Sequence, residues 1–527
     1  MKNKAQICSF ITVSLVFSFL FSCAIAPEPL SDGAGSAARI RKFVVTSGSN
    51  PYLTVPEVQC SIEEGVDSGV IRATIPGGTS PLLSLRWSIA AGSLKSGGVS
   101  LVSGKVFDIS VIKTVEAVDR KGRSRIYRLE IADSGIPTVY VKTKDNAPII
   151  SKDDWVDATI AIAGGGTAWA FPLPLSDTRI RGRGNSTWGM PKKPYRLSFS
   201  KAVSVFGMAE SKTWVLLANY ADKSLMRNIV AFETARILDG KDFVPHQYPV
   251  ELYLNGEYQG AYCVGEQIET GKGRVDIGKP SGGSDTAFFL EVNMRSELEG
   301  GIVDKDFFVT SSSVYMDYKM PKAEDVTPAQ REAIRTFVNK AEAAILSGKG
   351  YEEYIDVASF IDWIIIEELF KSHDSNFLSS VYLHRNTGGK LMLGPLWDFD
   401  LAAGNSDYGN IAGYDVKDSR GWFTTTAAWL DALMKNPEFK RAFAARWFDM
   451  RNVLESTAMG TIDTTERLLS RVQEPTFEKW KIMGIYVWPN PPELVAADSH
   501  AKQVDALTAW LKERFIWLDS EIGKMRD

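Results

Sequence analysis

Two carboxylates stand close together in the stretch GPLWDFDLAAGN, which runs from Gly394 to Asn405. Asp398 and Asp400 lie on either side of a phenylalanine, in a segment bracketed by glycines. A hard divalent cation such as Mg²⁺ prefers carboxylate oxygen as its ligand. The segment is therefore either part of a metal site or an acidic turn after a hydrophobic strand, and by itself it leaves both interpretations open.

Another acid, Asp374, follows the apolar stretch VASFIDWIIIEELF in the sequence KSHDSNFLSSVYLHRN. The end of a buried helix is expected to deliver it into a loop, where an aspartate could accept a proton from a hydroxyl group. The alternative is that Asp374 or Asn376 only caps a turn. A strand, a turn and a strand lead on to Asp398, and a hairpin can bring both acids to one mouth. Phosphoryl transfer needs such a pair, because one carboxylate orients the attacking hydroxyl and another holds Mg²⁺.

A source of positive charge precedes these acids in RIRGRGNSTWGMPKKPYRLSF, where a glycine-rich turn joins two strands. Gly182 and Gly184 would let the backbone approach a ligand closely. A cation on the second strand, Lys192, Lys193 or Arg196, could pair with a phosphate. A glycine hairpin with solvated lysines would have the same sequence, so this segment alone does not decide between the two.

The elements that must position these residues begin after an N-terminal β region. Short runs of alternating apolar and polar residues from 39 to 134, separated by Gly, Ser and Pro turns, predict a β-sandwich of immunoglobulin-like size. It contains no catalytic constellation, so a spacer or a binding module is expected. Pro137 precedes a new strand, and the pattern stays β-rich to Phe199.

Helices then enter the pattern. The stretch DKSLMRNIVAFETARILD has helical spacing, with Asp222 as a possible cap. Strands return around Asn255–Gly256, a pair that favours a tight hairpin turn. Thr327 begins a helix with a capping box, the stretch 357–372 is apolar nearly all round and predicts a buried helix, and the chain beyond Trp422 is expected to be helical to its end.

The whole pattern predicts an α+β fold in which an N-terminal β-sandwich precedes a two-lobed body at 138–527. Its β-rich lobe and helical lobe would join near Glu266 to Asp276, with the active site in the cleft between them. The chain has 527 residues, of which 44% are hydrophobic and 24% charged, an ordinary globular composition. A formal net charge of −4 argues against nucleic acid as a partner. Phosphate-loop, His-Glu-x-x-His and Gly-x-Ser-x-Gly motifs are absent from the sequence, and its 4 histidines argue against a His-rich metal site.

The N-terminus, MKNKAQICSFITVSLVFSFLFSC, has two lysines and an apolar run too short for a comfortable membrane span. Residues 1–23 predict a lipoprotein signal peptide with Cys23 lipidated, and a plain signal or a membrane anchor is the alternative. Residues 24–38 predict a flexible tether. We therefore expect a lipoprotein of the cell envelope, on its periplasmic or surface side. Cys60 and Cys263 fall in different predicted domains and are expected to be two buried thiols.

Four segments carry a family resemblance: RGRGNSTWGMPKKPYRLSF, WVLLANYADKSLMRN, VELYLNGEYQGAYCVGEQIE and GPLWDFDLAAGN. In this order and spacing they closely resemble the CotH family, the spore-coat protein H type of atypical protein kinase. The resemblance covers about Val139 to Phe423, with a helical tail consistent with it. It implies a protein-kinase-like two-lobed fold and phosphorylation of protein hydroxyls with Mg²⁺ and ATP.

The resemblance also implies roles for individual residues. Asp374 matches the family's catalytic aspartate, and Asp398 matches the metal-binding aspartate of its Trp-Asp-x-Asp motif. Asp400 is the second acid of that motif and either contacts the metal or caps the turn. Lys193 or Arg196 would be the cation that binds the nucleotide phosphates, and the sequence does not choose between them.

Other matched residues belong to the glycine-rich turn and the first helix. Arg181, Arg183 and Asn185 should lie over the nucleotide, whereas Arg227 and Asn228 would face either the cleft or the packing between lobes.

The chain also departs from an ordinary protein kinase. Position 379, where such a kinase has its second metal-binding asparagine, is a serine, so a second metal would need Asn376 or Asn405 instead. A lipoprotein outside the cytoplasmic membrane also has no assured ATP supply. That objection keeps open a second class of function, a non-catalytic surface or periplasmic binding module on the same fold.

Overall fold

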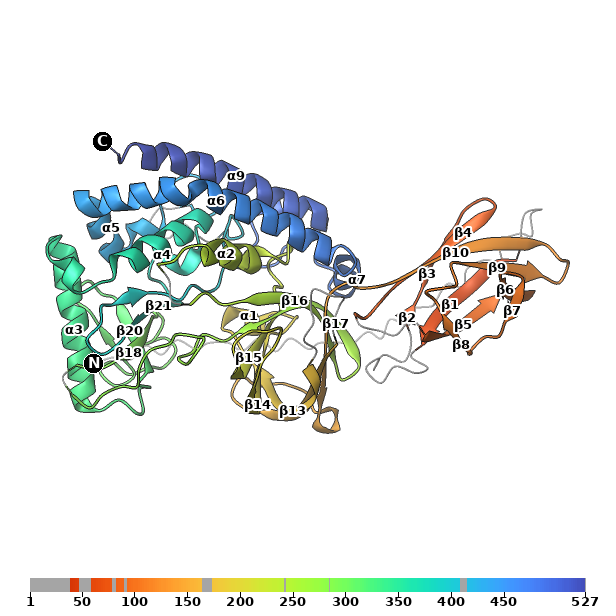
Figure 1. Ribbon diagram of the computed structural model, residues 1–527, viewed down its shortest axis with the longest axis horizontal. Coiled ribbons are helices and arrows are strands. Elements are labelled where there is room, and N and C mark those ends of the chain that lie inside the picture. The colour runs from red at the N-terminus through yellow and green to blue at the C-terminus, as the bar shows by residue number, and fades with distance from the viewer. Residues whose placement is uncertain are drawn as a thin grey trace, which may run out of the picture.

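A computed structural model shows how the chain folds (Figure 1). The structure describes residues 38–46, 58–77, 82–89, 92–163, 173–240, 243–283, 285–407 and 415–526. The predicted signal peptide, almost all of the predicted tether and Cys23 lie outside these ranges. The described part is a mixed α+β protein, β-rich toward its N-terminus and helical toward its C-terminus, as the sequence predicts.

The N-terminal region consists of two β-sheets that share one core. One sheet has the strand order β2-β1-β5-β8 and the other β3-β4-β10-β9-β6-β7. Phe43 and Leu85 from the first sheet pack with Ile71 and Tyr127 from the second, so apolar residues alternate inward from both. The immunoglobulin-like assignment stays a prediction. The strands are β1 (Ile40–Thr46), β2 (Val58–Gln59), β3 (Ser61–Glu64), β4 (Ser68–Ile75), β5 (Leu82–Ile89), β6 (Gly92–Ser96), β7 (Val99–Leu101), β8 (Val106–Asp108), β9 (Thr114–Asp119) and β10 (Ser124–Asp133).

A closed β-barrel follows, with the strand order β11-β12-β13-β14-β15-β17-β16. It closes where β11 pairs in parallel with β16, and its interior is filled by side chains such as Ile160, Trp214 and Leu252. Asn255 and Gly256 join β16 to β17 with φ of 53° and 83°, the left-handed turn that the sequence predicts. The strands are β11 (Thr138–Thr143), β12 (Val156–Ala163), β13 (Leu173–Gly182), β14 (Tyr195–Val203), β15 (Ser211–Leu217), β16 (Gln247–Leu254) and β17 (Glu257–Glu266).

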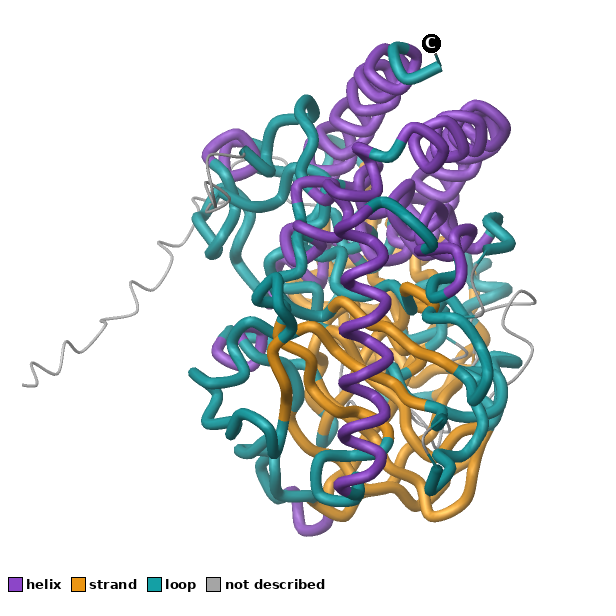
Figure 2. Tube along the Cα trace, turned by 90° about the vertical axis from the view of Figure 1, so that its left-hand side faces the viewer, coloured by secondary structure: helices purple, strands orange, loops and turns teal. Residues whose placement is uncertain are grey.

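The rest of the chain combines a five-stranded sheet with most of the helices. The sheet has the order β19-β20-β18-β21-β22, and α3 lies across it (Figure 2). The hairpin of β21 and β22 is the strand, turn and strand predicted before Asp398, whereas its pairing with β18 was not anticipated, because β18 and β21 are far apart in sequence. Its strands are β18 (Phe288–Val292), β19 (Phe307–Val309), β20 (Tyr315–Met320), β21 (Val381–Arg385) and β22 (Met392–Leu393). The helices of the chain are α1 (Ser186–Gly189), α2 (Arg227–Arg236), α3 (Pro328–Ser347), α4 (Val357–Phe370), α5 (Ala428–Lys435), α6 (Pro437–Leu469), α7 (Gln473–Lys479), α8 (Pro492–Ala496) and α9 (His500–Gly523).

The N-terminus of α3 has the cap that the sequence predicts, whereas α2 begins later than predicted. Thr327 and Gln330 form the predicted capping box of α3. The helix expected from Asp222 begins only at Arg227. Asp222 still serves its N-terminus, because its carboxylate accepts a hydrogen bond from the Arg227 amide at 2.9 Å and pairs with the Arg227 guanidinium at 2.6 Å.

Helix α4 is the centre of the helical part, and nearly all its residues are buried, as predicted. Glu368 on α4 forms a fully buried ion pair with Arg514 on α9, with 2.8 Å between nitrogen and oxygen. The same carboxylate accepts hydrogen bonds from the amides of Phe423 and Thr425. Helix α4 therefore leaves the core in a fixed direction, toward the segment that carries Asp374.

The barrel is fastened to the C-terminal part by contacts outside the sheets. The Lys223 ammonium donates to the carbonyl of Ile485 at 2.6 Å, and Asn490 donates to the carbonyl of Ala221 at 2.7 Å. The His500 ring contacts the Ser224 carbonyl at 3.0 Å. We call these three contacts the clasp.

Two further expectations concern the cysteines and the membrane. Cys60 and Cys263 are both free and buried, which confirms that they form no disulfide. Burial raises the pKa of each thiol to about 12. Within the described ranges, none of the helices has the length and apolarity needed to span a bilayer.

The buried pair predicts a strong stability effect. Arg514→Met leaves the Glu368 carboxylate buried without its cation, so the free energy of unfolding should fall by about 3–5 kcal/mol. Arg420→Met is the matched control, because Arg420 pairs with Asp418 on the surface and its loss should cost less than about 1 kcal/mol. Denaturant unfolding of both variants measures the difference. Equal, small losses would show that the buried pair does not fix α4.

Candidate active site

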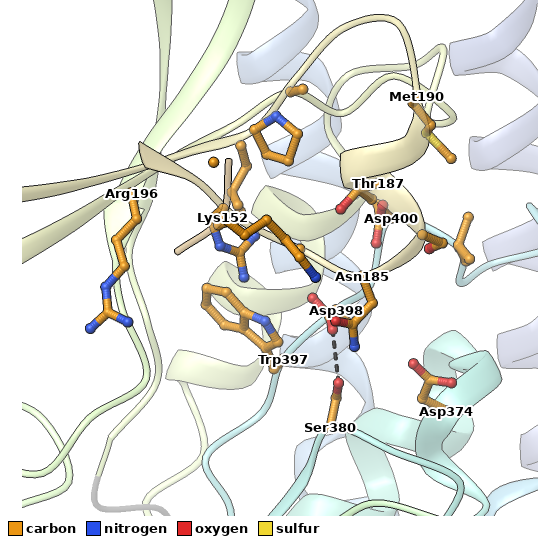
Figure 3. A pocket seen from close by; sticks show the side chains of 18 of the residues that line it. Lys152, Asn185, Thr187, Met190, Arg196, Asp374, Ser380, Trp397, Asp398 and Asp400 are labelled. Carbon is orange, nitrogen blue, oxygen red and sulfur yellow. Dashed lines mark hydrogen bonds between the residues drawn. The ribbon is translucent and has the colours of Figure 1, made fainter. Parts of the chain in front are cut away.

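A cavity of about 510 Å³ lies between the barrel and the five-stranded sheet. Figure 3 shows Asp374, Asp398 and Asp400 on one side of it and Arg196 on the other, across Trp397. The residues singled out in the sequence that line this cavity are Arg181, Gly182, Arg183, Gly184, Asn185, Lys192, Arg196, Asn228, Asp374, Asp398 and Asp400.

The WDFD segment places its two acids on the wall of the cavity. Trp397 and Phe399 are buried in the core, where Phe399 packs against Phe232 and Phe370 with ring centroids 5.7 Å apart in each case. Asp398 and Asp400 both line the cavity, and the buried ring of Phe399 between them anchors the segment in the core.

Hydrogen bonds fix the segment further. Asn228 on α2 accepts from the Phe399 amide at 2.8 Å, and Ser380 donates to the Asp398 carboxylate at 2.9 Å. Asp398 itself has a φ of 57°, a left-handed conformation unusual for a residue with a side chain. The surrounding contacts therefore hold this carboxylate in a conformation that an isolated turn would disfavour.

Asp374 is delivered by the end of α4. Lys371 ends that helix with a φ of 48°, and its ammonium donates to the carbonyls of Asp415, Asp418 and Arg420 at 2.6, 3.0 and 2.7 Å. The short helical turn that follows, His373–Ser375, carries Asp374 to the cavity. The sequence prediction of a helix end opening into a loop at Asp374 is thus met.

The pKa values of all three acids are raised, first by burial and then by neighbouring negative charge. Burial raises the pKa of Asp374 to about 7, and the charge of Asp398 adds to the increase. Burial also raises the pKa of Asp400 to about 7, with repulsion from Asp398 and Asp222. Burial raises the pKa of Asp398 as well, against the opposing effect of the Arg183 guanidinium. This side of the cavity therefore has a deficit of positive charge.

The opposite wall has an excess of positive charge. Burial lowers the pKa of Arg196, and repulsion from the guanidinium of Arg181 lowers it further. The Nε atoms of both these arginines are buried and have no hydrogen-bond partner in the described part of the chain. The Arg183 guanidinium lies over the Trp397 ring, 5.6 Å from its centroid. Buried donors without partners are costly, so this wall is suited to an anion that would accept from them.

The two candidate phosphate cations separate in the structure. Arg196 lines the cavity, whereas Lys193 lies outside it, where its ammonium donates to the Trp188 carbonyl at 2.6 Å. The neighbouring Lys192 is buried and lines the cavity, but its ammonium donates to the carbonyls of Ala218 and Ala261. Burial lowers the pKa of Lys192 to about 7.

Gly182 and Gly184 are required by the packing of the turn, a reason that the sequence interpretation missed. A Cβ on Gly182 would lie 2.4 Å from the Trp188 ring. Gly184 has a φ of 86°, and a Cβ there would lie 2.1 Å from the Thr187 hydroxyl. Both glycines therefore allow the turn to fold tightly against α1, whether or not a ligand approaches it.

The two polar residues at the start of α2, Arg227 and Asn228, have different roles. Arg227 is buried beside the residues that follow the WDFD segment, and its guanidinium donates to the Ala402 carbonyl at 3.1 Å. It therefore stabilises the packing of the core. Asn228 lines the cavity as well as holding the Phe399 amide.

Several cavity residues escaped the sequence analysis. Glu291 on β18 and Lys319 on β20 form an ion pair of 2.6 Å on the cavity wall, and Arg295 lies near Asp374. These residues carry no local motif, because only the register of β18 against β20 brings them together. Ser380 had a visible signal, since it stands beside Ser379 in the stretch already singled out.

The acids fit a bound Mg²⁺ ion. Their raised pKa values show that an added cation would be favourable there, and their donors are oxygen atoms, as that ion prefers. No three His, Cys, Asp or Glu side chains in the described ranges are grouped closely enough to form a metal site on their own. The protein therefore offers a partial ligand set, which phosphate oxygens and water would complete.

The cavity thus has carboxylate groups on one side and guanidinium groups on the other. A family model described as CotH kinase protein matches residues 180–518. The match covers more than half of the chain, and the chain belongs to the CotH kinase family, which confirms the resemblance. A search of curated proteins gave no match.

The crowding of the acids predicts a pH-dependent gain in stability on neutralisation. Because the folded protein holds the pKa of Asp400 near 7 rather than 3.8, ionising it costs stability increasingly as the pH rises from about 4 to 7. Asp400→Asn should thus raise the free energy of unfolding by about 1–4 kcal/mol at pH 8 without divalent cations, and change it little at pH 4. Thermal unfolding at both pH values measures this.

Asp449→Asn is the control for that measurement, since Asp449 lies on the surface of α6. An Asp400→Asn variant that is less stable at pH 8 would contradict the electrostatic description of the cavity.

Proposed function

We propose that this chain is a protein kinase of the CotH type, which transfers the γ-phosphoryl group of ATP to the hydroxyl of a protein side chain. The observation that carries the proposal is the division of one cavity into an acidic side and a guanidinium side. A nucleotide with its metal ion presents the matching charges, because its phosphates are anionic and the metal is cationic.

Each side of the cavity has a role in this proposal. Arg181, Arg183 and Arg196 bind the phosphate oxygens, with Asn185 in the turn beside them. Asp398, with Asp400, would hold Mg²⁺, which neutralises charge on the phosphates when bound.

Asp374 orients the acceptor hydroxyl and takes its proton. The hydroxyl oxygen forms a bond to the γ-phosphorus while the bond from that phosphorus to the bridging oxygen breaks, and ADP leaves with the electron pair. A base with a pKa raised toward 7 suits this step, since it is ionised near neutrality and still accepts a proton readily.

The architecture is proposed to be that of a two-lobed kinase. The barrel would correspond to the β-rich lobe, and the five-stranded sheet with α3 to α9 to the second lobe, so that residues 138–527 form one catalytic body. The place of the cavity between these parts supports the proposal.

The location of the enzyme is also a proposal. Cys23 would carry a lipid that tethers the protein to a membrane of the cell envelope, on its periplasmic or surface side, with residues 39–134 as an immunoglobulin-like spacer. The substrate would then be a protein that shares this compartment. The second candidate, a binding module that uses the same fold without catalysis, is favoured only if the cavity takes up no nucleotide.

The proposal is tested with two single-atom changes in the acids. Wild-type protein should show a Mg²⁺-dependent increase in melting temperature with ATP, and Asp398→Asn should lose it. Asp374→Asn should keep nucleotide affinity within about threefold while lowering phosphoryl transfer by about a hundredfold or more, because a base acts on the reaction and not on binding.

Asp431→Asn, a surface change on α5, is the control and should match wild type in both measurements. If wild-type protein showed no thermal shift with any nucleotide, the binding-module alternative would replace the kinase proposal.

A further inference from the structure

Ser379 occupies the position at which an ordinary protein kinase carries the asparagine for its second metal ion. Its side chain is buried, with an exposed fraction of 2%. Its hydroxyl oxygen accepts a hydrogen bond from Nη2 of Arg295 at 3.1 Å, and its hydroxyl is hydrogen bonded to the Asp374 carboxylate. A hydroxyl can accept from one group while it donates its proton to another, so Ser379 is a bridge between a guanidinium and the proposed base.

Neither of the other two candidate amides replaces the missing asparagine. Asn376 donates to the Phe423 carbonyl at 2.7 Å. Asn405 donates to the main-chain carbonyls of Asp400 and Ala221 at 2.7 and 3.1 Å, and its own side-chain oxygen accepts from Asn490 at 2.8 Å. Neither residue is among those that line the cavity. The side chains that could have held a second metal ion thus brace the surrounding loops instead.

Arg295 places a positive charge on the wall of the cavity. It lies in the turn after β18 and lines the cavity, and its amide is held by the Asn293 side chain at 3.1 Å. Its guanidinium charge acts on the carboxyl groups of both Asp374 and Asp398, lowering the pKa of each against the larger effect of burial. It is therefore near both proposed catalytic acids.

The guanidinium is also available to a ligand. The side chain of Arg295 is 44% exposed, and its carboxylate neighbour, Glu299, is 3.6 Å away and equally exposed. A pair at that distance on the surface is weak and is easily exchanged for a better acceptor. Phosphate is such an acceptor, because a guanidinium can donate two parallel hydrogen bonds to its oxygens.

We propose that Arg295, braced by Ser379 beside Asp374, supplies to the transferring phosphoryl group the positive charge that a second metal ion supplies in ordinary protein kinases. The chain then works with one divalent cation. This inference rests on the proposed function, since it concerns the same phosphoryl transfer.

Metal stoichiometry is the first test. Mn²⁺ titrated into the full chain with a non-hydrolysable ATP analogue, followed by electron paramagnetic resonance, should show one tightly bound ion per chain. The double variant Arg295→Ala, Ser379→Asn, which removes the fixed charge and restores the asparagine, should bind two. Two ions in the wild-type protein would overturn the proposal.

Transfer of the γ-phosphoryl group to water is the second test, because it needs no protein substrate. Arg295→Met should lower its kcat by about 10²–10³-fold while analogue affinity changes less than about threefold, and Arg295→Lys should recover part of the rate. Arg335→Met is the matched control, since Arg335 on α3 is 37% exposed and pairs with Asp304. It should behave like wild type.

The outcomes separate this inference from the proposed function. Wild-type protein that takes up no nucleotide would remove both. Nucleotide binding with one ion, but an unchanged rate in Arg295→Met, would remove only the role of Arg295. A rate lost toward an acidic peptide but kept toward water would also remove it, because Arg295 would then recognise the acceptor and not the phosphoryl group.

Discussion

The burial of three carboxylates in one enclosed space, with repulsion between them, is the constraint on which the site depends. Burial raises the pKa values of Asp374, Asp398 and Asp400, and the charge of Asp398 raises those of the other two further. An arrangement of this kind lowers the stability of the empty protein, so it persists only because the fold over-determines it. The same repulsion is what makes a cation, and an anion that brings one, favourable in the cavity.

The scaffold opposes this repulsion at a distance from the cavity. Buried contacts of Glu368 with Arg514, and of Lys371 with three carbonyls, fix the exit of α4. Asn228 fixes the WDFD backbone from the opposite side. Asp374 is thus held by a different part of the chain from Asp398 and Asp400, and separating them would break buried polar contacts.

Sequence patterns predicted what depends on local chemistry. The capping box at Thr327, the left-handed turn at Asn255–Gly256 and the all-round burial of α4 follow from residues close together in the chain. The family motifs located the acids and the arginines for the same reason. The hairpin of β21 and β22 was also predicted, but its pairing with β18 and the place of Arg295 were beyond such patterns, because they arise from strands separated by long stretches of chain. Lys193 and Arg196 could not be told apart in sequence, since the direction of each side chain depends on how the hairpin packs.

The clasp formed by Lys223, Asn490 and His500 has a bearing on how a ligand enters. It joins the segment that follows β15 of the barrel to the C-terminal part through three main-chain carbonyls, so these two parts are already connected when the cavity is empty. Contacts of this kind restrict movement of the barrel away from the C-terminal part. The entropy of aligning these two parts is then lost during folding rather than at each turnover. Empty and occupied forms should then superpose closely, with motion confined to side chains and to the glycine-rich turn.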